Sequence, residues 1–466
     1  MKTIKYFWTL CLVLAGFSLA SCSDDDNSGS TPMTIDKIFL ENIEDEVNND
    51  REVDFARLGQ LIRIQGSGFT GLKKILINGY DTYFNNALMT DNNVWVTLNG
   101  DTPVEKADDD VRNTIVLVKD GTRLVYQFTI RASAPTISSI DNTLPKPGET
   151  VTVYGTNLQE TTKLTLPGGV EVTSGIISDE DGEWYQFTMP SGVSAAGSIT
   201  SEGANGTAVT PPYFNDFSCF ITDFDGKGEL GTWSATYGTE DLVDDPLGTG
   251  RGKVAMLVPN VKLNAGGLDA GSNSLLWATA GNDNANDDWG SRMYSTVPAT
   301  TSAANVAIQF DVYCPEEWDL SGQMEISLQN NLSNYGYGSN GTKYSSQYYN
   351  TATVWVPWFN REDGSHAPFT TGERWQTITI PMTAFGNYDP TEAPDVTFQK
   401  ICEDRNAGSY RNFLVLFVNA DLEDEALGVK YPSKLFNQKI YIDNLRVVNT
   451  TPVSVSDFND EPATEE

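Results

Sequence analysis

Cysteine and histidine are scarce in this chain, and their scarcity excludes several classes of protein. The sequence has five cysteines among 466 residues and no C-x-x-C spacing, so it is not a disulfide scaffold. Its only histidine is His366. A zinc centre and a Ser-His-Asp triad both depend on histidine, so neither is expected, and we interpret His366 as an ordinary surface residue.

Basic residues are also few. The chain carries 30 Lys and Arg against 63 Asp and Glu, a formal net charge of −33. Such a charge repels nucleic acid phosphates and anionic lipid headgroups, and it disfavours polyanionic ligands. Neutral ligands are compatible with it. Beyond the N-terminus, no apolar run is long enough to span a bilayer.

A secretion signal opens the chain. Lys2 and Lys5 precede an apolar run over residues 6–19, and small residues lead from there to Cys22. This layout is typical of a signal peptide and is too short for a transmembrane helix. Residues 19–22, Leu-Ala-Ser-Cys, resemble the bacterial lipobox. The resemblance implies that residues 1–21 are removed and that Cys22 carries a lipid anchor.

An acidic run follows the cysteine at residues 23–26. It resembles the export tag of surface lipoproteins in Bacteroidetes-type bacteria, which implies a location on the outer membrane, facing the cell exterior. We assign residues 22–33 as the lipidated cysteine and an acidic linker. Residues 450–466 form an acidic tail at the other end of the chain.

An internal repeat organises the first half. Residues 59–69 align with residues 148–158 at an offset of 89 residues, and Trp95 falls on Trp184 at the same offset. In each copy apolar and polar residues alternate, which buries one face of a strand and indicates a β-sandwich. We place both tryptophans in the cores of their copies.

Glycines mark the end of each repeated segment. We expect Gly66 and Gly155 to end a strand at a sharp turn, and Gly68 and Asn157 to take positive φ. The pattern resembles the start of immunoglobulin-like TIG (IPT) domains. The resemblance implies two such modules, acting mainly as a spacer, at residues 34–131 and 135–214.

The third segment, residues 215–449, differs in composition. It holds seven of the ten tryptophans and shows no amphipathic helix of useful length. Alternating strands separated by turn residues predict a large antiparallel β-sandwich or jelly roll, so the whole chain is expected to be all-β. The predicted strands cover residues 306–313, 323–328, 353–356, 375–380, 413–419 and 439–447.

The surplus of aromatic residues points to carbohydrate. A tryptophan or tyrosine plane covers the apolar face of a sugar ring, and neighbouring polar groups bind its hydroxyls. Trp355 lies between two valines that we expect to point inward, so its ring should point outward. We interpret Trp375 as core. The predicted glycan contacts are Trp289, Trp318, Trp355, Trp358, Tyr337 and Tyr348.

Several motifs in order carry a resemblance to a family. The lipobox, the acidic tag and the tandem TIG-like modules are followed by segments 222–226, 355–358, 374–381 and 441–446. Together they resemble Bacteroidetes surface glycan-binding proteins of polysaccharide utilisation loci, with the xyloglucan-binding type of C-terminal domain. The resemblance implies non-catalytic capture of a neutral plant polysaccharide such as xyloglucan or mixed-linkage β-glucan, beside a TonB-dependent transporter and its lid lipoprotein.

Three alternatives stay open. The ligand could be a mannan-type hemicellulose. A surface glycoside hydrolase would need two opposed carboxylates, and adjacent pairs such as Glu316 and Glu317 define no such opposition. An adhesin is compatible with TIG-like modules, although the aromatic enrichment of the last domain argues against it.

A structural calcium ion is a further expectation. Asp223 and Asp225 lie near the start of the last domain and Asp443 near its end. The three carboxylates would approach one another if the first and last strands of the domain pair. We expect no other cofactor.

Overall fold

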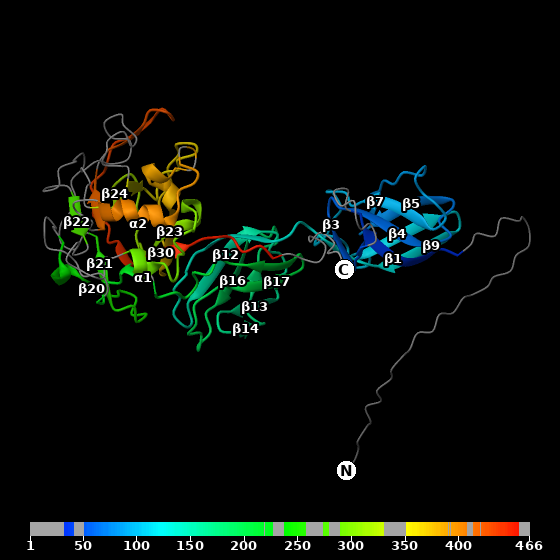
Figure 1. The fold of residues 1–466 in the computed structure, drawn as a ribbon, viewed down its shortest axis with the longest axis horizontal. Coiled ribbons are helices and arrows are strands. Elements are labelled where there is room, and N and C mark those ends of the chain that lie inside the picture. The colour runs from blue at the N-terminus through cyan, green and yellow to red at the C-terminus, as the bar shows by residue number, and fades with distance from the viewer. Residues whose placement is uncertain are drawn as a thin grey trace, which may run out of the picture.

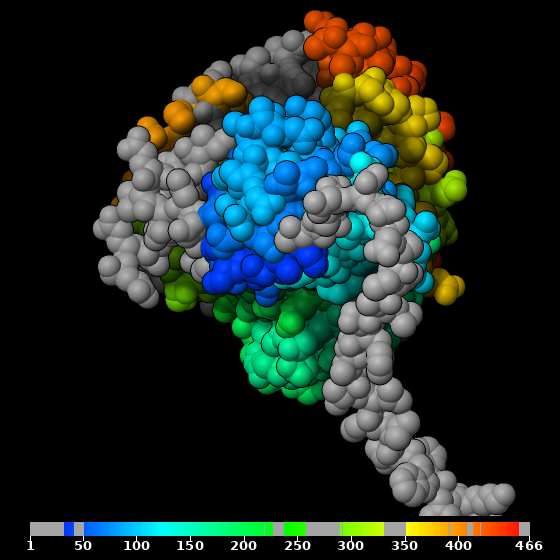
Figure 2. Space-filling model, turned by 90° about the vertical axis from the view of Figure 1, so that its right-hand side faces the viewer, coloured from blue at the N-terminus to red at the C-terminus, as the bar shows by residue number. Residues whose placement is uncertain are grey.

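Three β-rich bodies follow one another along the chain, with the first module and the third domain at opposite ends (Figure 1). A view turned by 90° places the first module in front of the other two (Figure 2). The computed structural model describes residues 32–41, 51–218, 220–226, 237–257, 274–278, 289–329, 351–389, 391, 393–407, 413–419 and 421–455.

Strands dominate the described residues, and the all-β prediction is confirmed. Helix is limited there to the single turn α1 (Gly290–Met293) and to α2 (Phe398–Ala407). No described helix is long and apolar enough to cross a membrane. Short 3-10 turns are η1 (Thr239–Asp241), η4 (Ala303–Asn305), η6 (Met382–Ala384) and η7 (Gly386–Tyr388).

The first module is a sandwich of two four-stranded sheets, ordered β2-β1-β4-β7 and β6-β5-β8-β9, with a parallel pair of β3 and β10. Ile62 and Ile64 of β4 are fully buried, as the alternation predicts. The strands are β1 (Thr34–Leu40), β2 (Arg51–Glu52), β3 (Phe55–Arg57), β4 (Leu61–Ser67), β5 (Leu72–Ile77), β6 (Tyr80–Thr82), β7 (Asn93–Thr97), β8 (Thr114–Lys119), β9 (Thr122–Gln127) and β10 (Thr129–Arg131).

The second module repeats this plan, with sheets ordered β11-β12-β16-β15 and β14-β13-β17-β18. Val151 and Val153 of β12 are buried at the positions that correspond to Ile62 and Ile64. The strands are β11 (Thr136–Ile140), β12 (Thr150–Thr156), β13 (Lys163–Leu166), β14 (Val170–Val172), β15 (Ile177–Ser178), β16 (Trp184–Thr188), β17 (Thr200–Gly203) and β18 (Gly206–Val209).

The repeated tryptophans are not core residues, and that prediction is wrong. Trp95 is half-buried in β7 between the buried Val94 and Val96. Trp184 is likewise half-buried, next to the fully buried Tyr185. Successive side chains of a strand point to opposite faces, so a tryptophan beside inward-pointing residues lies on the outer face of its sandwich.

The third domain packs a six-stranded sheet face to face with a four-stranded one. One has the order β20-β21-β30-β23-β26 with β19 paired to β30, and the other the order β22-β27-β24-β25. A hairpin of β28 (Leu422–Asp424) and β29 (Val429–Tyr431) follows β27. The remaining strands are β19 (Phe220–Thr222), β20 (Val243–Asp244), β21 (Lys253–Met256), β22 (Ser274–Ala278), β23 (Val306–Tyr313), β24 (Gln323–Ser327), β25 (Ala352–Trp355), β26 (Gln376–Pro381), β27 (Leu414–Val418) and β30 (Tyr441–Asn449).

The second module is fused to the third domain. Ala307 of β23 and Val448 of β30 belong to the same apolar cluster as the core of the second module. The backbone N–H of Thr377 donates to the carbonyl of Asp141 over 2.6 Å, and Thr143 N–H donates to the Thr377 hydroxyl over 2.9 Å. The third domain is therefore held at a defined orientation.

Candidate functional site

An aromatic cluster fills one part of the third domain, and Trp318 is at its centre. The Trp318 ring lies 5.4 Å from Trp355, 5.6 Å from Phe417, 6.0 Å from Phe436 and 6.3 Å from Phe369, centroid to centroid. Trp318 and Phe369 also exchange two backbone hydrogen bonds of 2.9 Å. Strands and loops that are far apart in the sequence therefore meet around one indole.

Trp318 and Trp358 are core residues, so their prediction as ligand platforms is wrong. Their exposed fractions are 0% and 2%. Both indole N–H groups donate to the carbonyl of Ser321, and that of Trp358 does so over 3.0 Å. A ring that is enclosed on all sides and hydrogen-bonded to backbone presents no face to a sugar.

Trp289 is also buried, and its prediction as a glycan contact is wrong. Its ring is fully enclosed, 6.0 Å from the ring of Phe413 and 4.8 Å from the guanidinium of Arg405. Arg405 itself is fully buried on α2. The polar loop that precedes Trp289 in the sequence suggested exposure, but the tryptophan packs against α2 instead.

Trp355 keeps part of its surface exposed. It ends β25, where Val354 and the following Val356 are buried at 3% and 5% exposure. The prediction that its ring points outward is wrong, because the ring packs against the fully buried Phe310 of β23 and against Trp318. The Trp355 ring makes edge-on contacts with Phe310 at 5.2 Å and with Phe369 at 5.8 Å. The indole is thus fixed by packing against three rings, and part of it stays exposed beside the half-buried Phe369.

Polar side chains lie on segments next to this cluster. Asp319 directly follows Trp318, and its carboxylate lies 2.9 Å from His366 Nδ1 and 3.7 Å from Lys434 Nζ. The His366 ring makes an edge-on contact of 4.9 Å with Tyr431, whose hydroxyl donates to the Gly364 carbonyl over 2.7 Å. We call Asp319, His366, Tyr431 and Lys434 the polar rim.

Sequence reasoning did not find the polar rim as a group. Its members come from segments more than 100 residues apart, from Asp319 to Lys434, and no motif links them. His366 is exposed, as predicted, but it contacts Asp319 and Tyr431.

Trp375 is 1% exposed, so its prediction as core is confirmed. Tyr337, Tyr348 and Cys22 lie outside the described residues.

The three carboxylates of the expected calcium site do not form one. The first and last strands of the domain do pair, β19 with β30, as that expectation required. However, the carboxylate of Asp225 accepts the backbone N–H of Lys253 over 2.8 Å, and that of Asp223 accepts the N–H of Asp225 over 3.0 Å. Within the part of the chain that the structure describes, no group of three or more His, Cys, Asp or Glu could hold a metal ion.

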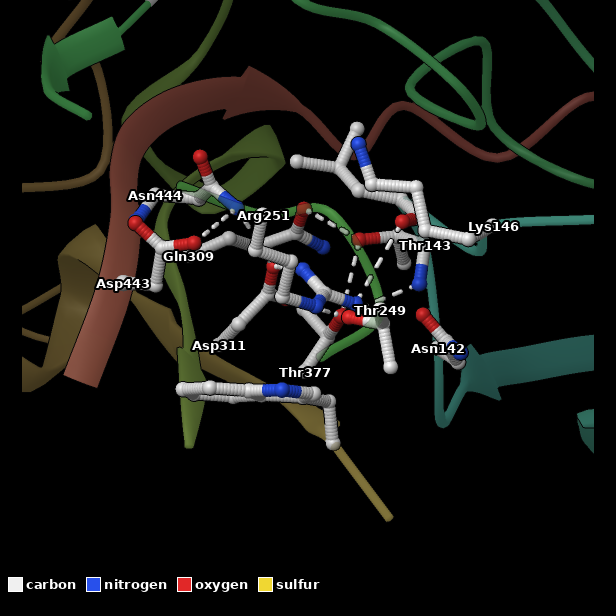
Figure 3. A network of polar contacts seen from close by, with 12 residues as sticks. Asn142, Thr143, Lys146, Thr249, Arg251, Gln309, Asp311, Thr377, Asp443 and Asn444 are labelled. Atoms are coloured by element: carbon white, nitrogen blue, oxygen red, sulfur yellow. Dashed lines mark hydrogen bonds and ion pairs between the residues drawn. The ribbon is translucent and has the colours of Figure 1, made fainter. Parts of the chain in front are cut away.

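Asp443 belongs instead to a buried charge network (Figure 3). Arg251 donates to Asp311 over 2.6 Å, and Asp443 accepts the backbone N–H of Asn444 over 2.8 Å and its side-chain amide over 2.9 Å. Burial, then the neighbouring Asp311 carboxylate, raises the pKa of Asp443 to about 8. Asp443 is fully buried, so this proton-holding carboxyl is closed to a ligand.

Comparison with known proteins decides the family. The model described as "Surface glycan-binding protein B xyloglucan binding domain" matches residues 214–449, just over half of the chain. The chain belongs to this family. The matched residues form the third domain, which carries Trp355 and the polar rim. The family is described as the xyloglucan-binding domain of surface glycan-binding proteins.

One solved structure shares the fold, and other proteins show weaker similarity. A surface glycan-binding protein from Prevotella bryantii, PbSGBP-B, has a TM-score of 0.63 at 19% identity, over 91% of this chain and 100% of that one. An SGBP-B from a complex xyloglucan utilization locus of Bacteroides uniformis covers 90% and 100% with a TM-score of 0.42 and 16% identity. An IPT/TIG domain-containing protein of Bacteroides ovatus is 25% identical over 156 residues. That match spans 33% of this chain and 31% of the relative.

Proposed function

We propose that this protein holds a neutral plant polysaccharide, xyloglucan or a related β-glucan, and does not cleave it. Trp355 supplies the aromatic contact and the polar rim supplies hydrogen bonds to the sugar hydroxyls. The observation that carries the proposal is that the family match covers the same domain in which one tryptophan of the aromatic cluster stays partly exposed.

The chemistry of this surface suits a sugar ring. The apolar face of a pyranose packs on an indole, and such contacts add about 0.5–1.5 kcal/mol beyond the buried area. Because Trp355 is already held by Phe310 and Phe369, little side-chain entropy is lost when a ligand binds. Asp319, His366 and Lys434 offer an acceptor and donors for hydroxyl groups at a surface that carries both signs of charge.

A hydrolase is the second candidate, and the described carboxylates do not favour it. Glycoside hydrolysis needs an acid with a raised pKa facing a second carboxylate across an open cleft. Asp443 has the raised pKa and Asp311 is its neighbour, but the two are 0% and 1% exposed. A buried pair at a domain junction cannot reach a glycosidic bond.

Anchoring and partners follow from the resemblance described above. We infer that Cys22 carries the lipid that attaches the chain to the outer membrane, with the acidic run directing it to the exterior. A TonB-dependent transporter with its lid lipoprotein is the proposed partner. The xyloglucan utilization locus named for the Bacteroides uniformis relative supports capture of glycan for import.

The test is affinity electrophoresis of the chain from Ser23 onward. Native gels would contain xyloglucan, mixed-linkage β-glucan, galactomannan or no glycan. We expect retardation by xyloglucan or mixed-linkage β-glucan, and Trp355→Ala should weaken binding about tenfold, the equivalent of about 1.4 kcal/mol. Trp184→Ala, which removes a half-buried tryptophan from the second module, is the matched control and should bind normally.

Three outcomes would contradict parts of this proposal. Unchanged retardation of a folded Trp355→Ala variant would place the site elsewhere, and retardation by galactomannan alone would favour a mannan-type ligand. No retardation in any gel would overturn the glycan assignment. Because Trp355 also packs in the core, His366→Ala and Lys434→Ala on the exposed rim test the same surface without a cavity.

A further inference from the structure

A pocket of about 380 Å³ opens on the outer face of the first module, far from Trp355 in the sequence. Pockets for small ligands begin at about 300 Å³, so this one has room for a ligand of about one sugar unit or more. It is lined mainly by apolar and aromatic side chains, among them Leu61, Tyr83, Asn85, Leu88, Trp95 and Thr97.

The sheet explains why these residues meet. Leu61 of β4 lies opposite Thr97 of β7, and Trp95 is two residues away on the same outer face. After β6 the chain returns along β7, where Phe84 forms a bridge with Val96. Phe84 points inward and is 9% exposed, so its neighbours Tyr83 and Asn85 point outward, above the half-buried Trp95.

Two of the apolar side chains that line this pocket are unusually exposed to solvent. Tyr83 is 83% exposed and Leu88 62%, the two largest values among the exposed large hydrophobic residues that the structure describes. Large apolar groups gathered at a pocket mouth cost solvation free energy unless a ligand covers them. Leu88 is held in place, since its N–H donates to the Asn85 carbonyl over 3.0 Å.

The polar groups of the pocket are neutral and free for a ligand. Asn85 Oδ1 accepts the N–H of Ala87 over 2.9 Å, which leaves its amide N–H donors unused within the described residues. None of the pocket residues named above is charged. Arg63, opposite Trp95 in the sheet, is ion-paired with Glu41 over 2.6 Å. Aromatic faces with an amide and a hydroxyl, and no charge, match a neutral sugar ring.

We propose that the first module carries a second glycan-binding site at this pocket, with Tyr83 and Trp95 as stacking surfaces and Asn85 and Thr97 as hydroxyl partners. This proposal rests on the proposed function insofar as the ligand is the same neutral polysaccharide. The two sites lie in the bodies at opposite ends of the molecule (Figure 1). A long chain that touches both is held more tightly than an oligosaccharide that reaches one.

The test follows the ¹⁹F NMR resonance of Trp95 during a titration with sugar. The chain from Ser23 onward is labelled with 5-fluorotryptophan, and Trp95→Phe assigns the ¹⁹F resonance of Trp95. Xylogluco-oligosaccharide and mixed-linkage β-glucan oligosaccharide are then titrated to millimolar concentration. We expect the Trp95 resonance to shift, and Tyr83→Ala to weaken that titration by about two- to tenfold. Since Tyr83 is exposed, its replacement leaves the fold intact.

Controls separate this site from that of the third domain. Tyr154→Ala removes an exposed tyrosine from the second module and should leave the Trp95 titration unchanged. A shift of Trp95 with no shift of Trp355 would uphold this site and contradict the third-domain site. A shift of Trp355 alone would overturn this site. A Trp95 resonance that moves with protein concentration but not with sugar would overturn it in favour of self-association.

Polymer binding supplies the second readout. Tyr83→Ala should reduce retardation in a gel containing xyloglucan polymer, while the affinity for a short oligosaccharide at Trp355 stays the same. Equal retardation of wild type and Tyr83→Ala in the polymer gel would contradict a bivalent role for the pocket.

Discussion

At the scale of single residues, the buried network places one cation, Arg251, near two buried acids, Asp311 and Asp443. Arg251 donates to Asp311, whereas the hydrogen bonds of Asp443 within the described residues come from Asn444. A second buried negative charge would be costly beside the first, so Asp443 keeps its proton and its pKa rises to about 8. The residue that the sequence suggested as a calcium ligand thus acts as a neutral hydrogen-bonding group at neutral pH.

This arrangement predicts a dependence of stability on pH. In the unfolded chain an aspartate loses its proton near pH 4, whereas folded Asp443 does so near 8. Between these values the folded state binds the extra proton, so this group's contribution to stability falls as pH rises from about 4 to about 8. Asp443→Asn keeps the neutral form at every pH and should remove that loss.

Thermal unfolding of wild type and Asp443→Asn at pH 5.5 and pH 8.5 checks this prediction. We expect the variant to become more stable relative to wild type between the lower and the higher pH. Parallel changes of Tm in the two proteins would contradict a raised pKa for Asp443. Asp421→Asn, which alters an exposed aspartate, is the control and should follow wild type.

At the scale of elements, the repeat is explained by close backbone approach rather than by strand ends. A Cβ atom at Gly66 would lie 1.9 Å from the carbonyl oxygen of Thr34, and one at Gly155 would lie 1.9 Å from that of Thr136. Both glycines lie within strands, so the prediction that they end a strand is wrong. The expected positive φ is confirmed at Gly68 (74°) and Asn157 (56°).

The close approach predicts an unequal response to alanine. Gly66→Ala must push β4 away from β1 and should destabilise the first module by at least about 1–3 kcal/mol. Gly100→Ala places its methyl group in open space and should change stability by less than about 0.5 kcal/mol. Chemical denaturation of both variants measures the difference, and equal stabilities would refute the steric explanation.

At the scale of the whole molecule, the two junctions differ. Between the first and second modules, Asn205 bridges the backbone N–H of Ala132 and the carboxylate of Glu105, over 2.8 and 2.7 Å. Between the second module and the third domain, an apolar core is shared, and Arg251 pairs with Glu149 across the junction. A fragment that begins at residue 215 would expose Ala307 and Val448, so the smallest fragment we expect to fold well begins before β11.

Arg251 tests this second junction. Its side chain is 1% exposed, and it pairs with Asp311 of the third domain and, over 3.6 Å, with Glu149 of the second module. Arg251→Ala leaves buried carboxylate unpaired, at a cost of about 3–5 kcal/mol. We expect calorimetry to show a lower melting transition for the second module and third domain, with faster proteolytic cleavage between them.

The control removes a charge at the junction between the first and second modules. Lys106 pairs with Asp181 over 3.2 Å with both side chains about three-quarters exposed. Lys106→Ala should therefore change stability by less than about 1 kcal/mol. If Arg251→Ala melted like Lys106→Ala, the shared network would not hold the two bodies together.

The sequence by itself determined the all-β class, the repeat and the positions of the strands. For example, the strand predicted over residues 306–313 is β23, because alternation of apolar and polar residues is a local property of the chain. The family resemblance was equally readable, since it depends on the order of motifs along the chain.

Only the tertiary structure decided which aromatic side chains face solvent. Trp318 is buried because Trp355, Phe417 and Phe436 arrive from distant segments to cover it, whereas Trp355 packs in the same cluster and stays partly exposed. The pairing of Arg251 with Asp311, 60 residues apart, arises in the same way. Burial and charge partners depend on contacts between segments far apart in sequence, and local periodicity carries no information about those contacts.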